Sequence, residues 1–263
     1  MTSFAPPDYV VPQWPAPANV RAVCTTRAGG VSVGPYASLN LGTHVGDDPL
    51  AVAQNRTLLA QAMGAKPVFL NQVHGTHMLA LETDSVDGQD ADGSFTTQTG
   101  LACSVMVADC LPILLCDTQG RQVAAVHAGW RGLAGANGQG VLEEIYKQFR
   151  PLALVEPAQA ATKVIAWLGP CIGPTVFEVG AEVRAAFVAT SAQAADCFVP
   201  QPGGKWLANL PALARQRLLA LGIDAVYGND GSAPWCTVGN PLRFFSYRRD
   251  GVSGRMAACI WLA

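Results

Sequence analysis

The sequence predicts an α+β fold, a single compact domain over residues 1–263 in which helices flank mixed β-sheets. Hydrophobic residues make up 50% of the chain and charged residues 14%, whereas ordinary soluble domains carry about 25% charged residues. This composition excludes disorder and indicates a large core. Short apolar runs alternate with helical patterns, but without the regular order of a Rossmann sheet. No repeat or linker divides the chain.

The first hundred residues predict a strand, a helix and a pair of strands set among loops. Residues 1–19 hold five prolines and predict a surface arm. The apolar periodicity then predicts the following elements: a strand at 20–26, glycine-rich loops at 27–42, a helix at 47–63, strands at 67–74 and 77–83 joined by Gly75-Thr76, and a polar loop at 84–99.

The rest of the chain predicts a buried sheet followed by helices. Apolar runs at 102–110, 112–118 and 122–129 are typical of central strands. Val141, Leu142, Ile145 and Phe149 form one face of a long helix. Beyond it we expect a strand at 163–168, helices at 178–189 and 210–221, the second with Asn209 as N-cap, and a terminal hairpin around Asp250-Gly251.

Charge and cysteine content narrow the choice of partners. The net charge of −2 gives no basic footprint for nucleic acid or an anionic membrane surface. No apolar stretch reaches the roughly 18 residues of a membrane span, and the N-terminus lacks the pattern of a targeting peptide. The eight cysteines contain no C-x-x-C pair, so we expect reduced thiols and a cytoplasmic protein. The expected partner is a small molecule, and no protein partner is predicted.

Three residues carry the strongest chemical signal: His74 in NQVHG, Cys110 in ADCLP and His127 in HAGWRG. Each lies at the end of an apolar run, where a side chain projects into loops that a substrate reaches. Two histidines and one cysteine form a catalytic zinc set with one open position. The same groups also suit a thiolate nucleophile with an imidazole base.

Each of these residues also has a plainer interpretation, as a structural histidine or a buried thiol. His44 and His77 we assign to structure or surface. If a metal is bound, a second group should orient each imidazole through its other nitrogen. Asp109 and Gln72 are the nearest candidates in the sequence.

Arginines in glycine-rich or aromatic surroundings give a second signal, since a guanidinium suits phosphate or carboxylate. These are Arg27, Arg131, and Arg248 with its neighbour Arg249. Structural ion pairs are the alternative for each. The glycine-rich segment at 29–42 has neither a P-loop lysine nor a G-x-G-x-x-G pattern before a helix, so common nucleotide-phosphate loops are not indicated.

Six strings in order resemble one family. They are TTRAGGVSVGPYASLNLGTHVGDD, NQVHG, ADCLPILL, AAVHAGWRG, GPCIGPTVFEVG and CTVGNPLRFFSYRRDGVSGRMAACIWL. Together they are similar to the YfiH family, also called laccase-like multicopper polyphenol oxidoreductases or peptidoglycan editing factors. The resemblance covers about residues 25–262. One departure is Phe177, where the family pattern leads us to expect tyrosine.

The resemblance implies an α+β fold also seen in a cysteine-hydrolase-like toxin domain. It implies a metal site of His74, Cys110 and His127. From the ligand set we expect Zn²⁺ in this site, with Cu²⁺ as an alternative. The resemblance further implies phosphorolysis of adenosine, inosine and methylthioadenosine, with adenosine deaminase activity beside it. We expect substrate contacts from residues in or beside the six strings: Arg27, Asn40, Gln72, Arg131 and Arg248.

The histidine count limits the laccase interpretation. A blue-copper centre takes two histidines and would leave two of the four for a trinuclear cluster, which is too few. Polyphenol oxidation is therefore expected as a side activity of copper in the three-ligand site. Two rival functions stay open: an amidase that edits peptidoglycan precursors with Cys110 as nucleophile and His127 as base, and a non-catalytic purine-binding protein.

Overall fold

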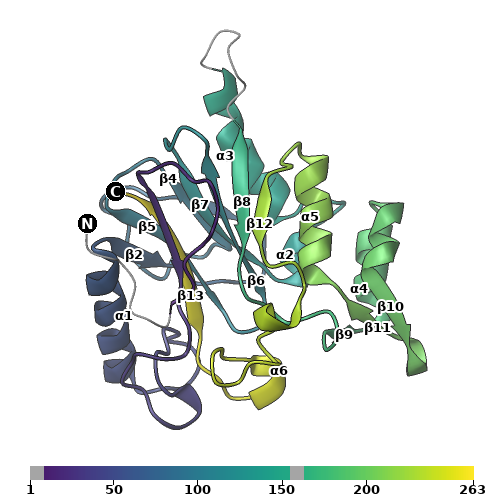
Figure 1. The fold of residues 1–263 in the computed structure, drawn as a ribbon, viewed down its shortest axis with the longest axis horizontal. Helices are drawn as coiled ribbons and strands as arrows, with labels where there is room; N and C mark the ends of the chain where they lie inside the picture. Colours follow the sequence, from purple (N-terminus) through teal and green to yellow (C-terminus); the bar gives the residue numbers. More distant parts are fainter. Residues whose placement is uncertain (1–8, 155–162) are drawn as a thin grey trace.

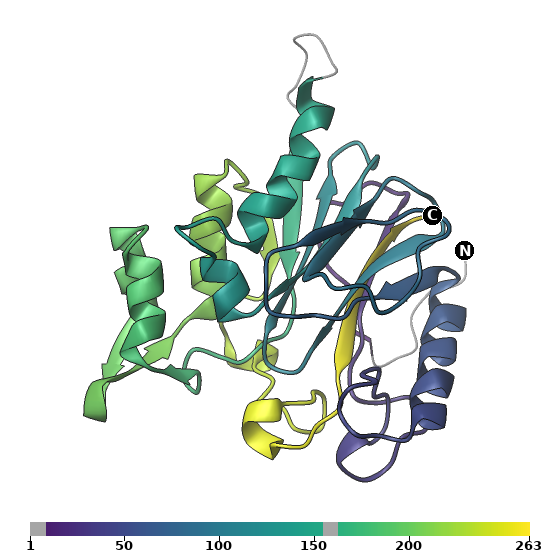
Figure 2. The same cartoon turned by 180° about the vertical axis from the view of Figure 1, so that it is seen from behind.

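Two β-sheets packed face to face form the centre of the fold, and helices cover their outer faces (Figure 1). The structure is a computed structural model and describes residues 9–154 and 163–263. Figure 2 shows from behind that α1 (Pro49–Met63) lies on one outer side and α3 (Val141–Leu154) on the other. No helix in these described ranges is long and apolar enough to cross a membrane.

The first sheet has four strands in the order β1-β13-β5-β2. All neighbours in it are antiparallel except β2 and β5, which run parallel. Its strands are β1 (Val20–Cys24), β2 (Lys66–Phe69), β5 (Leu101–Val107) and β13 (Met256–Leu262).

The second sheet has six strands in the order β12-β8-β6-β7-β4-β3. Its centre is antiparallel, and the outer pairs β12/β8 and β3/β4 are parallel. Its strands are β3 (Met78–Ala80), β4 (Gly93–Thr96), β6 (Leu111–Asp117), β7 (Val123–Ala128), β8 (Val164–Leu168) and β12 (Val226–Gly228).

Three apolar clusters separate these layers. Val105, Trp167 and Ile260 belong to the cluster between the two sheets. The outer face of the first sheet packs with Leu59 of α1, and the outer face of the second with Ile145 of α3. Because both sheets are covered on both faces, their strands are almost wholly apolar, as the sequence indicated.

A third, small sheet lies to one side with α4 (Figure 1). Its strands are β9 (Glu178–Val179), β10 (Phe198–Gln201) and β11 (Lys205–Ala208). The remaining helices are α2 (Trp130–Ala134), α4 (Ala181–Val188), α5 (Leu210–Ala220), α6 (Tyr247–Asp250) and the 3₁₀ turns η1 (Gly34–Tyr36), η2 (Ala192–Cys197), η3 (Pro202–Gly204) and η4 (Ala233–Trp235).

The helix predictions are confirmed because local capping agrees with the periodicity. Asp48 accepts a hydrogen bond from the Leu50 N–H at the start of α1, and Gly64 ends it with a φ of 61°. Asn209 accepts from the Ala212 N–H and caps α5. The long helix after His127 is also present. The helix expected at 178–189 is present as α4 over Ala181–Val188, but Glu178 and Val179 form strand β9 instead.

Several strand predictions are wrong, because strand partners lie far apart in the sequence. The three central runs divide between two sheets, β5 in the first and β6 and β7 in the second. The strands expected at 67–74 and 77–83 belong to different sheets and form no pair. The segment at 84–99, expected to be a loop, contains β4, and β9–β12 were not foreseen.

Both ends of the chain also differ from expectation. The expected terminal hairpin is wrong: α6 and a turn precede the single strand β13, which pairs with β1 and β5. Residues 1–8 of the expected surface arm lie outside the described residues. The remainder is attached to the body, since Val10 exchanges backbone hydrogen bonds with Cys24 and Trp14 packs on the cluster between the sheets.

Candidate metal centre and active site

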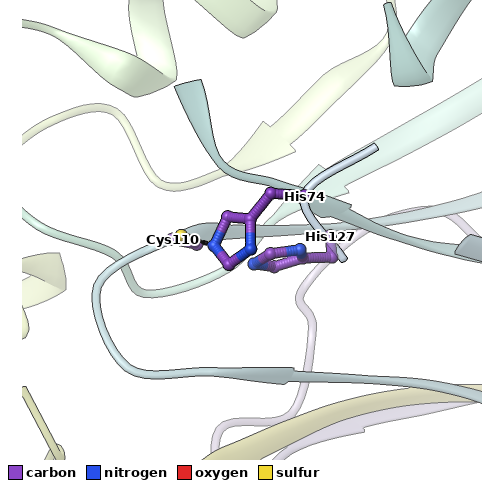
Figure 3. A group of neighbouring side chains, drawn as sticks. All are labelled: His74, Cys110 and His127. Carbon is purple, nitrogen blue, oxygen red and sulfur yellow. Dashed lines mark hydrogen bonds between the residues drawn. The ribbon is translucent and has the colours of Figure 1, made fainter. Parts of the chain in front are cut away.

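Three separate segments bring His74, Cys110 and His127 to one point (Figure 3). His74 lies between β2 and β3, with a φ of 59°. Cys110 lies in the turn between β5 and β6, and His127 lies on β7. His127 is buried, Cys110 is half-buried and His74 is exposed. The cluster thus lies where strands and connections of both sheets end.

The ligand atoms of the cluster lie close enough for one metal ion. The nitrogen and sulfur atoms all lie within 4.8 Å of one another, and Cys110 Sγ is 4.0 Å from His74 Nε2. Ligands of a tetrahedral zinc are roughly 3.3–3.6 Å apart, given bond lengths of about 2.0–2.3 Å, so a small contraction suffices. The donor set, two imidazoles and one thiol with an open position, fits Zn²⁺.

Gly129 makes room for this cluster. A Cβ atom at this position would lie 3.1 Å from His74 Cδ2 and 3.2 Å from Cys110 Sγ. A larger residue would therefore press on two of the three ligands. The glycine of the HAGWRG string thus permits the close approach of β7 to the His74 segment.

A buried carboxylate, Asp92, connects the two histidines. Asp92 Oδ1 lies 2.9 Å from His127 Nδ1 and accepts a hydrogen bond of 2.9 Å from the His74 backbone N–H. Its Oδ2 accepts from the N–H groups of Val73 and Gly75, at 3.3 and 2.6 Å. The expectation that Asp109 and Gln72 orient the imidazoles is therefore wrong.

Asp109 and Gln72 have other partners. Asp109 accepts hydrogen bonds from Thr237 Oγ1 and from the Arg248 backbone N–H. Gln72 bonds with both the N–H and the C=O of Met106, which fixes the segment before His74 to β5. Neither side chain bonds to an imidazole of the described residues, since these partners occupy their polar atoms.

The residues of the cluster and the neighbouring Asp92 shift one another's pKa values. Burial opposes the Cys110 thiolate, but the charges and hydrogen bonds of His127 and His74 prevail and lower the Cys110 pKa from 9.0 to about 6. Burial likewise opposes the His127 cation, but Cys110 and Asp92 raise the His127 pKa to about 9. The pKa of Asp92 is lowered in spite of its burial, through His127 and the backbone N–H groups. Without a metal, the cluster therefore favours a thiolate–imidazolium pair at neutral pH.

The cluster opens into a cavity of about 350 Å³. One part of the lining is apolar or aromatic: Trp130, Ile172, Phe177, Leu210 and Tyr247. Another part is basic: His44, Arg131, Arg248 and Arg255. A largely apolar cavity with a few convergent polar groups is typical of a small-molecule site.

The structure separates the predicted substrate-contacting residues into two groups. Gln72, Arg131 and Arg248 line the cavity. Arg27 and Asn40 do not: Arg27 donates to the carbonyls of Ala37 and Pro241, and the buried Asn40 side chain bonds within its own loop and to the Arg255 N–H. Both therefore organise loops behind the cavity.

Sequence reasoning missed Asp92, Arg255 and His44. Arg255 stands in the last of the six family strings, so its position beside a terminal strand was a usable signal. His44 was assigned to structure or surface but lines the cavity. Asp92 gave no signal, because its contacts with His127 and His74 are made across 35 and 18 residues of sequence.

Comparison with known proteins shows the family of the chain. Residues 21–263 match the model of the family described as multi-copper polyphenol oxidoreductase laccase. The chain belongs to this family. Two curated relatives, both named purine nucleoside phosphorylase, are 49% identical (Shigella flexneri) and 48% identical (Pseudomonas aeruginosa) to this chain. The alignments cover 96% and 97% of this chain and 98% of each relative.

Solved structures of similar proteins share the fold. A Neisseria meningitidis protein superposes with a TM-score of 0.86 at 46% identity, over 97% of this chain and 99% of that chain. YlmD of Geobacillus stearothermophilus gives a TM-score of 0.81 at 30% identity, over 93% and 92%. The predicted family and the α+β fold class are confirmed. Within the described ranges, His74, Cys110 and His127 are the one group of histidine, cysteine or acidic residues suited to a metal ion.

Proposed function

We propose that this chain is a metal-dependent purine nucleoside phosphorylase that acts on adenosine, inosine and methylthioadenosine. One observation carries the proposal: the His74–Cys110–His127 cluster opens into a cavity with aromatic walls and three arginines that form no ion pair with a described carboxylate. An aromatic wall suits a purine, and guanidinium groups suit phosphate. The names of the curated relatives support the same activity.

We propose Zn²⁺ as the metal, held by the two imidazoles and the Cys110 thiolate. When bound, zinc would supply a Lewis acid that polarises an oxygen atom at the open position. Copper binds nitrogen and sulfur ligands more tightly than zinc does. Copper in the same site would account for polyphenol oxidation as a side activity.

The residues of the cavity would position the two reactants. Arg131, Arg248 and Arg255 would hold phosphate, and Trp130 and Phe177 would contact the base. A phosphate oxygen forms a bond with the anomeric carbon of ribose while the bond from that carbon to the purine nitrogen breaks. The phosphate proton finally resides on the released base, so the products are the free base and ribose 1-phosphate. Positioning and charge neutralisation supply most of the rate in such a reaction.

The decisive experiment measures products from inosine and adenosine with and without phosphate. Zinc-loaded protein should release hypoxanthine or adenine and ribose 1-phosphate only when phosphate is present. Cys110→Ala should lose both turnover and bound metal. Free base formed at an equal rate without phosphate would contradict phosphorolysis, and tight purine binding without product would indicate a binding protein instead.

The adenosine deaminase activity that we propose beside phosphorolysis uses the same open cluster. Water would add to the purine carbon that bears the amino group, and ammonia would leave, which gives inosine. Formation of inosine from adenosine in phosphate-free buffer, abolished in Cys110→Ala, tests this activity.

A cysteine amidase acting on peptidoglycan precursors is the second candidate, and the lowered pKa of Cys110 beside His127 favours it. The thiolate would attack an amide carbon and form a thioester, the amine would leave, and water would release the acid. A covalent adduct on Cys110, with full activity after chelation, would support this mechanism over the zinc mechanism. We further propose that the enzyme acts in the reducing cytosol, which the eight free cysteines support.

A further inference from the structure

Asp92 bonds to both histidine segments of the cluster and is not itself one of the three candidate ligands. It precedes β4, and its carboxylate is fully buried. The side chain reaches the His127 ring and the His74 backbone, as described above. Its main chain also accepts a hydrogen bond of 2.7 Å from the His127 N–H. Two different atoms of Asp92 therefore hold His127.

The bond to the ring determines which imidazole nitrogen faces the cluster. A carboxylate only accepts hydrogen bonds, so the hydrogen of the His127 ring resides on Nδ1. The lone pair of the neutral ring is then on Nε2, on the side of Cys110 and His74. A metal requires that lone pair, and a carboxylate partner also raises the basicity of the ligand.

The bonds to the backbone fix the second histidine. His74 has a φ of 59°, which is uncommon for a residue with a side chain. Asp92 accepts the N–H groups of Val73, His74 and Gly75, and so turns three consecutive amides toward one carboxylate. This arrangement holds the His74 ring 4.9 Å from the His127 ring, centroid to centroid, at an angle of 81°.

The partners of Asp92 argue for a role beyond folding. Among the described residues no lysine or arginine pairs with Asp92, and its ion-pair partner is His127. Burying a carboxylate with no lysine or arginine beside it costs free energy. In this site the His127 ring and the backbone N–H groups of the His74 segment offset that cost, and these are the groups that position the metal ligands.

We propose that Asp92 is the positioning residue of the cluster: it sets the tautomer of His127 and the backbone turn of His74, and so gives the cluster its affinity for a divalent metal. The proposal rests on the metal site of the proposed function. Asp92 itself touches neither the metal nor the substrate. In Asp92→Asn an uncharged amide replaces the carboxylate. The amide NH₂ group would then face the ring and backbone N–H groups that bond to Asp92, and these are hydrogen-bond donors as well.

The test compares metal affinity in two matched variants of the purified full-length chain. Asp92→Asn is the variant, and Asp117→Asn is the control. Asp117 is also a fully buried carboxylate; it accepts the N–H groups of Arg121 and Gln122, at 2.7 and 2.8 Å. It lies at the far end of β6 from Cys110. Zn²⁺ affinity is measured by competition with a chromogenic chelator, and Co²⁺ absorption reports the ligand geometry.

We expect Asp92→Asn to bind Zn²⁺ about 10–100-fold more weakly than wild type and to change the Co²⁺ absorption bands. Asp117→Asn should keep wild-type affinity and bands, even if its melting temperature falls. Wild-type affinity in Asp92→Asn, or an equal loss in Asp117→Asn, would overturn the proposal. A wild-type chain that binds neither ion would overturn the proposed metal site as well, which distinguishes the two failures.

Folding is followed by circular dichroism and thermal melting in every sample. If Asp92→Asn does not fold, Asp92→Ser keeps one acceptor oxygen and takes its place in the same measurements. Loss of the fold in both variants, with Asp117→Asn folded, would assign Asp92 to folding and overturn the proposal.

Discussion

The carboxylate of Asp109 accepts a hydrogen bond of 2.7 Å from the backbone N–H of Arg248. Asp109 directly precedes Cys110 and has a φ of 95°, and Arg248 belongs to α6. Both residues line the cavity. The other oxygen of Asp109 accepts a hydrogen bond from Thr237 Oγ1. The Asp109 side chain therefore connects the turn that contains Cys110 to helix α6, which contains Arg248.

Removing this connection should impair catalysis. Asp109→Ala frees α6, so Tyr247 and Arg248 lose their fixed position in the cavity. We expect kcat/KM for inosine phosphorolysis to fall about tenfold or more, the equivalent of about 1.4 kcal/mol. Steady-state kinetics measure this, with Asp230→Ala as control, because Asp230 is an exposed carboxylate that also accepts a backbone N–H. Equal kinetics in the two variants would refute the role of the connection.

The cluster itself was predictable because strand ends determine it. His74, Cys110 and His127 each lie at the end of an apolar run. When a glycine or proline ends such a run, the last side chains of the strand lie at the edge of the sheet. The strand partners were not predictable in the same way. Asp92 meets His127 because β4 pairs with β7, and no local pattern in the polar segment at 84–99 encodes that pairing.

The roles of individual arginines could not be predicted from the sequence either. Arg27 and Arg248 both stand in distinctive strings, and both donate to backbone carbonyls, yet only Arg248 lines the cavity. A guanidinium suits either role, and only the fold decides which carbonyls lie within its reach.

Arg131 gives the cleanest test of phosphate binding. Arg131 lines the cavity, and its guanidinium stacks on the Trp130 ring at 4.5 Å from the ring centroid. The guanidinium makes no hydrogen bond or ion pair with the described residues. Arg131→Gln therefore removes no hydrogen bond of the described fold. A lost charge-assisted contact of about 1.5 kcal/mol would raise the KM for phosphate about tenfold, with a smaller effect on the KM for inosine.

The control for Arg131→Gln is Arg21→Gln, an exposed position on β1 outside the cavity. Kinetics at varied phosphate concentration measure both variants. An unchanged KM for phosphate in Arg131→Gln would exclude this arginine from the phosphate site.

The lowered pKa of Cys110 predicts its reactivity in metal-free protein. Because only the thiolate reacts with iodoacetamide, the rate should rise between pH 5 and 7 with a midpoint near the Cys110 pKa of about 6, and then level off. The other seven cysteines are buried, so mass spectrometry should find a single modified site. Zinc should protect it, and Cys110→Ser should remain unlabelled. A midpoint near the ordinary thiol pKa of 9.0 would contradict the pairing with His127.

Asn55 should be a main stabiliser of the loops behind the cavity. Asn55 lies on α1 and is fully buried. Its Nδ2 donates to Ser32 Oγ and to the carbonyls of Ser38 and Asn40. Its Oδ1 accepts a hydrogen bond from the Val31 N–H. Asn55→Ala leaves several of these groups buried without a partner, which costs about 1–3 kcal/mol each. For a loss of about 3 kcal/mol we expect a melting temperature lower by about 6–10 °C. Calorimetry measures this against Gln54→Ala, an exposed neighbour on the same helix, and equal melting temperatures in the two variants would show that the loops hold without Asn55.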